Sequence, residues 1–159
     1  MARNDDAGDA LAAPGLHRFA DLTVQVAAPL EVGPVGHGVR RVIPIIGGTC
    51  VARDWSARVL AGGADFQLVV NARMARLEAR YVLETDAGER IYVHNDALRT
   101  AAPDVMARLV RGEPVDPAQV YFRCAPRFET AAPNLAWMME RMFLGTGLRR
   151  PDDVVMRFF

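Results

Sequence analysis

The chain has 159 residues, about half of them hydrophobic, and its 19 basic residues, all arginine, balance 19 acidic residues to a formal net charge of zero. A chain of this length favours one domain and can bury a sizeable core. The balanced charge excludes the basic footprint of a nucleic-acid-binding or membrane-surface protein, and no apolar run approaches the roughly 20 residues that a membrane-spanning helix needs.

The N-terminal segment predicts a tail rather than a folded element. Residues 1–13 are rich in aspartate and lack the apolar centre of a secretory signal peptide. We expect residues 1–18 to form a disordered or loosely attached tail and residues 19–159 to form a single domain. The protein is expected to be soluble and cytoplasmic.

Short runs rich in β-branched residues, separated by glycine and proline, dominate the first half of the chain. Leu22, Val24 and Val26 recur with period two, which is the spacing of a half-buried strand. The glycine- and proline-rich segment 29–38 predicts a loop, and Pro44 places the next strand near an edge, a bulge or a bend. The strands predicted here cover residues 22–26, 39–46 (ending at Gly47-Gly48), 55–60, 66–70 and 75–85.

The second half of the chain predicts a hairpin, two short helices and two further strands. The turn Asp86-Ala87-Gly88 leads into a returning antiparallel strand over 90–95. The first helix has Pro103 near its start and Gly112 after its apolar stripe. Gly145-Thr146-Gly147 predicts a turn, because it lacks the third glycine and the preceding strand of a nucleotide-binding loop. The remaining elements are helices over 103–111 and 133–142 and strands over 120–124 and 154–159.

This pattern predicts an all-β, mainly antiparallel fold. About eight to ten short strands alternate with turn signals, whereas two short helices are too few for a βαβ architecture. A closed barrel is favoured over a sandwich because closure removes the sheet edges. A small barrel can also hold a ligand in its interior.

A series of short phrases runs in order through the chain: Gly38–Gly48, Gly62–Gln67, Glu78–Tyr81, Ile91–Asn95, Gly112–Pro117, Tyr121–Arg123, Arg127–Thr130 and Phe143–Pro151. In this order, over residues 22–155, they resemble a bacterial family of unknown function, DUF3237. The resemblance implies one closed barrel of calycin-like or lipocalin-like shape and implies no settled activity. The chain departs from the family at the turn Asn71-Ala72-Arg73-Met74, which lacks the usual Asp-Gly, and at Ala97, where a glycine is more usual.

Asp65 and Gln67 are the first candidates for a site. They lie two residues apart after Gly62-Gly63, so both side chains should point to the same face of a strand. A carboxylate on a barrel wall that is partly desolvated would have a raised pKa and could transfer protons near neutral pH. The alternative is that Asp65 caps the Gly-Gly turn through backbone amides.

Glu78, Arg80 and Tyr81 form the second group of candidates. If the face of Glu78 and Arg80 points inward, Arg80 is expected to bind a substrate oxyanion and Glu78 to act as a base or to orient Arg80. The opposite face of this strand is uniformly apolar, which favours an outward Glu78–Arg80 face. Tyr81 is then the inward residue, with a hydroxyl able to donate to a bound carbonyl.

The remaining candidates lie at predicted corners and ends. Arg123 and Glu129 flank an expected turn at Pro126, either as a structural ion pair or as a lumen acid with its arginine partner. Asn95 is expected to end its strand at a turn or at the barrel rim. Arg41, in one of the family phrases, and Trp137, on the second helix, are further ligand-binding candidates, although Trp137 also fits the role of a core plug.

We expect no metal site and no cofactor. His17, His37 and His94 lack metal-ligand spacing. Cys50 and Cys124 show neither a disulfide framework nor an adjacent base, so both are expected to be buried free thiols.

The resulting hypothesis is a cofactor-independent enzyme of the lyase, isomerase or cyclase type that acts on a small, largely apolar metabolite in the lumen. Its catalytic candidates are Asp65, Glu129, Arg80 and Tyr81, and its ligand-binding candidates are Gln67, Glu78, Asn95, Arg123, Arg41 and Trp137. The alternative is a non-catalytic barrel that carries or senses a hydrophobic ligand. No nucleic-acid or membrane partner is expected, and self-association, as a homodimer, is a further expectation.

Overall fold

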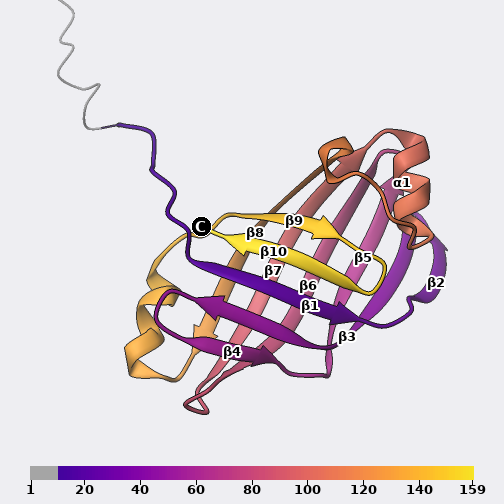
Figure 1. Ribbon diagram of the computed structural model, residues 1–159. Helices are drawn as coiled ribbons and strands as arrows, with labels where there is room; N and C mark the ends of the chain where they lie inside the picture. Colours follow the sequence, from indigo (N-terminus) through magenta and orange to yellow (C-terminus); the bar gives the residue numbers. More distant parts are fainter. Residues whose placement is uncertain (1–10) are drawn as a thin grey trace, which may run out of the picture.

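Ten strands hydrogen-bond into one antiparallel sheet that closes on itself in the computed structural model, which describes residues 11–159 (Figure 1). The first ten residues, which belong to the expected tail, lie outside the described residues. The strands are β1 (Ala20–Val26), β2 (Leu30–Val35), β3 (Gly38–Ala52), β4 (Ser56–Val59), β5 (Gly63–Asn71), β6 (Met74–Thr85), β7 (Arg90–Ala101), β8 (Val120–Thr130), β9 (Gly145–Arg149) and β10 (Asp153–Phe158).

The barrel closes because β1 pairs with β10 on one edge and with β3 on the other. The long strand β3 has three more partners: its residues 38–42 pair with β2, its residues 39–45 pair with β5, and its residues 49–51 pair with β4. Both β4 and β5 then pair with β6, so they occupy one position in the ring. The predicted closed antiparallel barrel is therefore confirmed.

Two short helices lie at opposite ends of the barrel, as Figure 1 shows. At one end α1 (Pro103–Val110) buries Val105, Met106 and Leu109. At the other end η3 (Pro133–Glu140), a 3-10 helix, buries Leu135 and Met138 against the main core. A single 3-10 turn, η2 (Pro117–Gln119), precedes β8. None of the helices within residues 11–159 has both the length and the apolar character that crossing a lipid bilayer requires.

The η3 end of the barrel is filled by aromatic rings. Phe19 packs against Trp137 at 5.6 Å between ring centroids and against Phe143 at 4.8 Å, and Phe128 packs edge-on against Phe143 at 5.0 Å. Offset and edge-to-face contacts of this kind stabilise beyond the area they bury. This end is therefore a hydrophobic plug, and Trp137 is part of it.

Two predicted interruptions in the first half of the chain are wrong. The expected loop at 29–38 contains β2, which tolerates Gly33 and Pro34 because, within the described residues, it is an edge strand that pairs with β3 alone. The strand predicted to stop at Gly47-Gly48 continues to Ala52. Gln25 of β1 lies opposite Gly47 of β3, but the next residue, Val26, lies opposite Ile45. This register shift marks a bulge in β3 close to Pro44, where the sequence predicts a bulge or a bend.

Three boundaries in the second half are also corrected. Strand β7 does not end at Asn95 but runs to Ala101. Strand β8 continues straight through Pro126, because its β9 edge is unpaired beyond Cys124 and the missing N–H of proline costs no ladder hydrogen bond there. Residues 145–147, predicted as a turn, belong to β9. The two cysteines are buried and free, as predicted.

Candidate functional site

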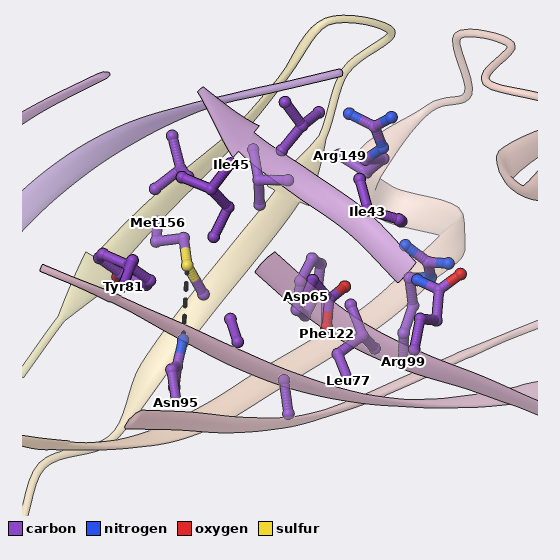
Figure 2. A pocket seen from close by; sticks show the side chains of 16 residues that line it. Ile43, Ile45, Asp65, Leu77, Tyr81, Asn95, Arg99, Phe122, Arg149 and Met156 are labelled. Atoms are coloured by element: carbon purple, nitrogen blue, oxygen red, sulfur yellow. Dashed lines mark hydrogen bonds between the residues drawn. The ribbon is translucent and has the colours of Figure 1, made fainter. Parts of the chain in front are cut away.

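A cavity of about 50 Å³ lies inside the barrel and is lined by side chains from every strand except β2 and β4 (Figure 2). Most of the wall is apolar, with Leu77, Phe122 and Met156 among its members. A cavity of this size has room for a few water molecules or a small group of ligand atoms. Its polar members are Asp65, Gln67, Tyr81, Asn95, Arg99 and Arg149.

A wider groove of about 510 Å³ adjoins the cavity at the α1 end of the barrel. The wall of the groove includes Arg41, Glu31 and the C-terminal residues of α1. Because five residues line both spaces, we infer that the groove is the mouth of the lumen. The shared residues are Val26, Ile43, Gln67, Arg99 and Arg149.

Asp65 is the carboxylate of the lumen and is only 9 % exposed on β5. Its Oδ1 accepts a hydrogen bond from the backbone N–H of Glu78 at 3.0 Å, and among residues 11–159 this is its only hydrogen-bond partner. Burial raises the pKa of Asp65 to about 6, against the opposing charge of Arg99. The bond to Glu78 crosses from β5 to β6, so Asp65 does not cap the Gly62-Gly63 turn through its side chain.

Arg41 is a partnered arginine at the mouth, only 5 % exposed. Its Nε donates to Glu31 at 2.8 Å, and its two terminal nitrogens donate to Gln67 Oε1 at 3.2 Å and to the carbonyl oxygen of Val110 at 3.0 Å. These bonds tie β3 to β2, β5 and the end of α1. Arg41 therefore holds the mouth in shape.

Arg99 differs from Arg41 although it is buried as deeply, with 2 % exposure. No hydrogen bond joins its guanidinium to another described residue, and its Nε is buried without a partner. Its guanidinium carbon lies 5.9 Å from the centre of the Phe122 ring. Burial lowers its pKa to about 10, so Arg99 remains a cation at neutral pH.

Arg149 completes the basic end of the lumen. One of its terminal nitrogens donates to the carbonyl oxygen of Asp153 at 3.1 Å, and burial lowers its pKa. Figure 2 shows Arg99 and Arg149 at the same end of the pocket, with Asp65 between them and the opposite end.

The opposite end of the lumen carries two neutral polar groups, Tyr81 and Asn95 (Figure 2). Asn95 donates from Nδ2 to the sulfur of Met156 at 3.5 Å. The Asn95 Oδ1 and the Tyr81 hydroxyl are both buried without a hydrogen-bond partner among the described residues. Burial raises the pKa of Tyr81, which keeps its hydroxyl protonated and able to donate. Arg99 lies four positions after Asn95 on β7, which corresponds to roughly 13 Å at the rise of an extended strand.

Replacing Tyr81 by phenylalanine is expected to leave the free energy of unfolding unchanged or to raise it by up to about 1 kcal/mol. The reason is that a buried hydroxyl without a partner carries a desolvation cost and gains no hydrogen bond in return. The free energy of unfolding of Tyr81→Phe is measured by urea unfolding. Tyr92→Phe, a change outside the cavity, is the control. A loss of more than about 1 kcal/mol in Tyr81→Phe alone would show that the hydroxyl has a structural partner.

Glu78 and Arg80 do not reach the lumen. They form an ion pair on the outer wall of β6, so the outward placement favoured by the apolar period of this strand is confirmed. The expected lumen roles of Arg80 as an oxyanion ligand and of Glu78 as a base do not hold. Their neighbour Tyr81 does point inward, as the alternation requires.

Arg123, Glu129 and Trp137 also lie outside the cavity. Arg123 and Glu129 lie six positions apart on one continuous strand, β8, which corresponds to roughly 20 Å of extended chain. They therefore make neither the corner ion pair nor a lumen acid with an arginine partner. Arg123 instead lies over the ring of Tyr121, 4.9 Å from its centre.

Two lumen residues, Arg99 and Arg149, were not predicted. The alternation of β7 could have identified Arg99, because Ile91, Val93 and Asn95 point inward and every second residue after them does so too. The predicted strand stops at Asn95 and therefore does not reach Arg99. Arg149 gave no local signal, since a turn is predicted where its strand begins. Of the predicted residues, the structure brings Asp65, Gln67, Tyr81 and Asn95 to the cavity and Arg41 to its mouth.

Among residues 11–159, one group of potential metal ligands forms on the outer wall, where Glu78, His94 and Asp96 place ligand atoms within 4.8 Å of one another. Arginines already bind both carboxylates, since Arg80 pairs with Glu78 and Arg127 donates to Asp96 at 2.9 Å. This arrangement favours an ion-pair network over a cation site.

Comparisons with known proteins agree with the barrel and assign it no activity. Residues 14–159 match a family model described as "Protein of unknown function (DUF3237)". A UPF0311 protein of Rhodopseudomonas palustris is 43% identical over 134 residues, which cover 84% of this chain and 88% of the relative. A UPF0311 protein of Clostridium acetobutylicum is 36% identical over 139 residues, covering 87% of this chain and 88% of the relative.

Solved structures show the same architecture. The crystal structure of the conserved protein of unknown function from R. palustris has a TM-score of 0.83 at 38% identity and covers 92% of this chain and 100% of its own. A "beta-barrel like protein" from Acinetobacter baumannii has a TM-score of 0.80 at 32% identity, covering 93% and 97%. A protein described as an enzyme from Penicillium herquei has a TM-score of 0.67 at 14% identity, covering 93% and 96%, a likeness of fold alone.

Proposed function

The chain belongs to the DUF3237 family of proteins of unknown function, and we propose that it is a cofactor-independent enzyme in which Asp65 transfers a proton to or from a small, largely apolar molecule in the barrel lumen. Isomerisation, elimination, cyclisation and epoxide opening are the reaction types that such a site suits. Each of them needs only placed proton donors and acceptors.

The observation that carries this proposal is the buried carboxylate of Asp65 at the centre of a mostly apolar cavity. Its pKa of about 6 gives it both protonation states near neutral pH, which is the condition for an efficient general acid or base. A purely apolar cavity would instead have favoured a carrier. The hydrogen bond from the Glu78 N–H fixes one carboxylate oxygen and leaves the other available for substrate.

Tyr81 and Asn95 have a supporting role in this proposal. Their unpartnered polar atoms lie in the same cavity as Asp65. The Tyr81 hydroxyl is a neutral donor suited to polarising a carbonyl or stabilising an enolate oxygen, while Asp65 removes or returns the proton at carbon.

Proton exchange at carbon tests the proposal without knowledge of the natural substrate. Butanone, cyclopentanone and 2-oxopentanoate are incubated with the protein in D2O, and loss of the protons next to the carbonyl is followed by NMR. We expect the wild-type protein to accelerate exchange of at least one probe above the buffer rate. Asp65→Asn, which keeps a hydrogen-bond acceptor but loses the base, is expected to lower that acceleration by about 100-fold.

The matched control is Asp86→Asn, a change at an exposed aspartate in the β6–β7 turn, which is expected to leave the rate unchanged. An unchanged rate in Asp65→Asn would remove Asp65 from the proton-transfer role. If no probe exchanged faster with the wild-type protein than in buffer, the enzyme hypothesis would be contradicted.

A non-catalytic binding barrel is the second candidate function. It is favoured by one specific observation, the buried guanidinium of Arg99 without a partner among the described residues, because such a group suits the binding of a ligand whether or not the ligand reacts. Ligand binding with no Asp65-dependent exchange is the outcome that this candidate predicts.

A further inference from the structure

The guanidinium of Arg99 is buried in a way that requires a partner. Arg99 is 2 % exposed, its Nε is buried and unpaired, and no described residue accepts a hydrogen bond from its guanidinium. Burying a charge without a hydrogen-bonded counter-group is costly, so buried arginines are normally paired. Asp65 lowers this cost through space but forms no ion pair with Arg99 within 4 Å among residues 11–159.

The comparison with Arg41 shows that the barrel is able to satisfy a buried arginine when the arginine is structural. Arg41 is equally buried in the same mouth, and all three of its nitrogens donate to Glu31, Gln67 and the carbonyl of Val110. Arg99 lines both the cavity and the mouth and makes none of these bonds. Its free donors therefore face the place where a ligand enters.

We propose that the lumen takes a small organic carboxylate, whose carboxylate group is held by Arg99 beside Arg149 at the junction of the cavity and its mouth. The inference rests on the proposed function only in placing the ligand in the lumen. A guanidinium presents parallel N–H donors that match the two oxygens of a carboxylate. The apolar wall formed by Val26, Ile43 and Phe122 suits the hydrocarbon part of such a ligand.

The charges at the junction favour a monoanion over a phosphate dianion. Arg41 is neutralised by Glu31, so Arg99 and Arg149 face one lumen carboxylate, Asp65, and one positive charge is in excess. Two further acids lie nearby, namely Asp153, already paired with Arg150, and Asp152, exposed on the rim. A single negative charge neutralises the site, whereas a second one would be repelled by Asp65.

The experiment compares three probes with the full-length protein: hexanoate, its neutral isostere hexanamide, and butyl phosphate. Affinity is measured by calorimetry, and 15N-labelled arginine reports on each Nε–H by NMR. We expect hexanoate to bind at least about 10-fold more tightly than hexanamide and more tightly than butyl phosphate, because charge-assisted hydrogen bonds are roughly twice as strong as neutral ones. The Arg99 Nε–H signal is expected to shift on addition of hexanoate.

Variants assign the effect to Arg99. Arg99→Leu is expected to weaken hexanoate binding by about 10-fold or more, to the level of hexanamide, while Arg99→Lys retains part of it. The control Arg80→Leu removes an arginine from the outer wall and is expected to bind hexanoate as the wild type does. If Arg99→Leu does not fold, the affinities of the three probes for the wild type and for Arg99→Lys still test the inference.

Four results would overturn the inference: no measurable binding of hexanoate, equal binding of hexanamide, tighter binding of butyl phosphate, or unchanged hexanoate affinity in Arg99→Leu. Its failure can be separated from a failure of the proposed function. Arg99-dependent binding of hexanoate without Asp65-dependent proton exchange would keep the carboxylate site and remove the acid–base role. Asp65-dependent exchange of butanone without hexanoate binding would do the reverse.

Discussion

Replacing Gly48 by alanine is expected to lower the free energy of unfolding by at least about 4 kcal/mol, or to prevent folding. Gly48 has a φ of +135°, a backbone conformation that residues with a side chain rarely adopt. A Cβ at this position would lie 2.1 Å from the carbonyl oxygen of Thr23 in the facing strand β1. Since backbone faces backbone there, relief would require parting β1 from β3, the pairing that closes the barrel.

Alanine variants of two other glycines separate the cost of the backbone conformation from the cost of the steric clash. The free energy of unfolding of each variant is measured in urea by circular dichroism. Gly33 has a φ of +104° but open space where a Cβ would lie, so Gly33→Ala is expected to cost about 1–2 kcal/mol for the conformation alone. Gly36, in the turn between β2 and β3, has open space and no positive φ, so Gly36→Ala should cost little. A Gly48→Ala variant no less stable than Gly33→Ala would contradict the close approach of β1.

These glycines also explain which parts of the fold the sequence could not predict. A local pattern treats Gly47-Gly48 and Gly145-Thr146-Gly147 as stops, because glycine is common in turns. In the barrel they lie inside strands, where they make room for neighbours far away in the chain. A Cβ on Gly147 would lie 2.7 Å from the ring of Phe122, and one on Gly145 would lie 2.6 Å from the sulfur of Cys124. Crowding between β8 and β9 is a tertiary property that no window of sequence contains.

The site was predictable to the extent that it depends on strand alternation. Asp65 and Gln67 share a face, and Tyr81 points inward opposite to Arg80, because successive side chains of a strand alternate. Arg99 and Arg149 lie at the same end of the lumen because β7, β8 and β9 are neighbours in this order around the barrel. The local sequence pattern does not encode that order. The sequence therefore predicts the lumen carboxylate, Asp65, but not the two arginines that give one end of the lumen its positive charge.

Asp65→Asn is expected to raise the free energy of unfolding by about 3 kcal/mol at pH 8, even though it removes the proposed acid–base group. Burial raises the pKa of Asp65 from an ordinary 3.8 to about 6 in the folded protein. Between these two values the folded state binds more protons than the unfolded state, so stability falls as pH rises from about 4 to 6 and stays low above it. Two pKa units correspond to about 3 kcal/mol.

The asparagine variant lacks this ionisation and retains an oxygen able to accept the hydrogen bond from the Glu78 N–H. Urea unfolding at pH 4, 6 and 8 should therefore show a gain over the wild type that is small at pH 4 and largest at pH 8, while Asp86→Asn follows the wild type throughout. If Asp65→Asn were less stable than the wild type at pH 8, Asp65 would be a structural residue whose charge the fold needs. A variant that gains stability and loses proton transfer would instead show that the barrel keeps a destabilising carboxylate in its lumen for the chemistry that it performs there.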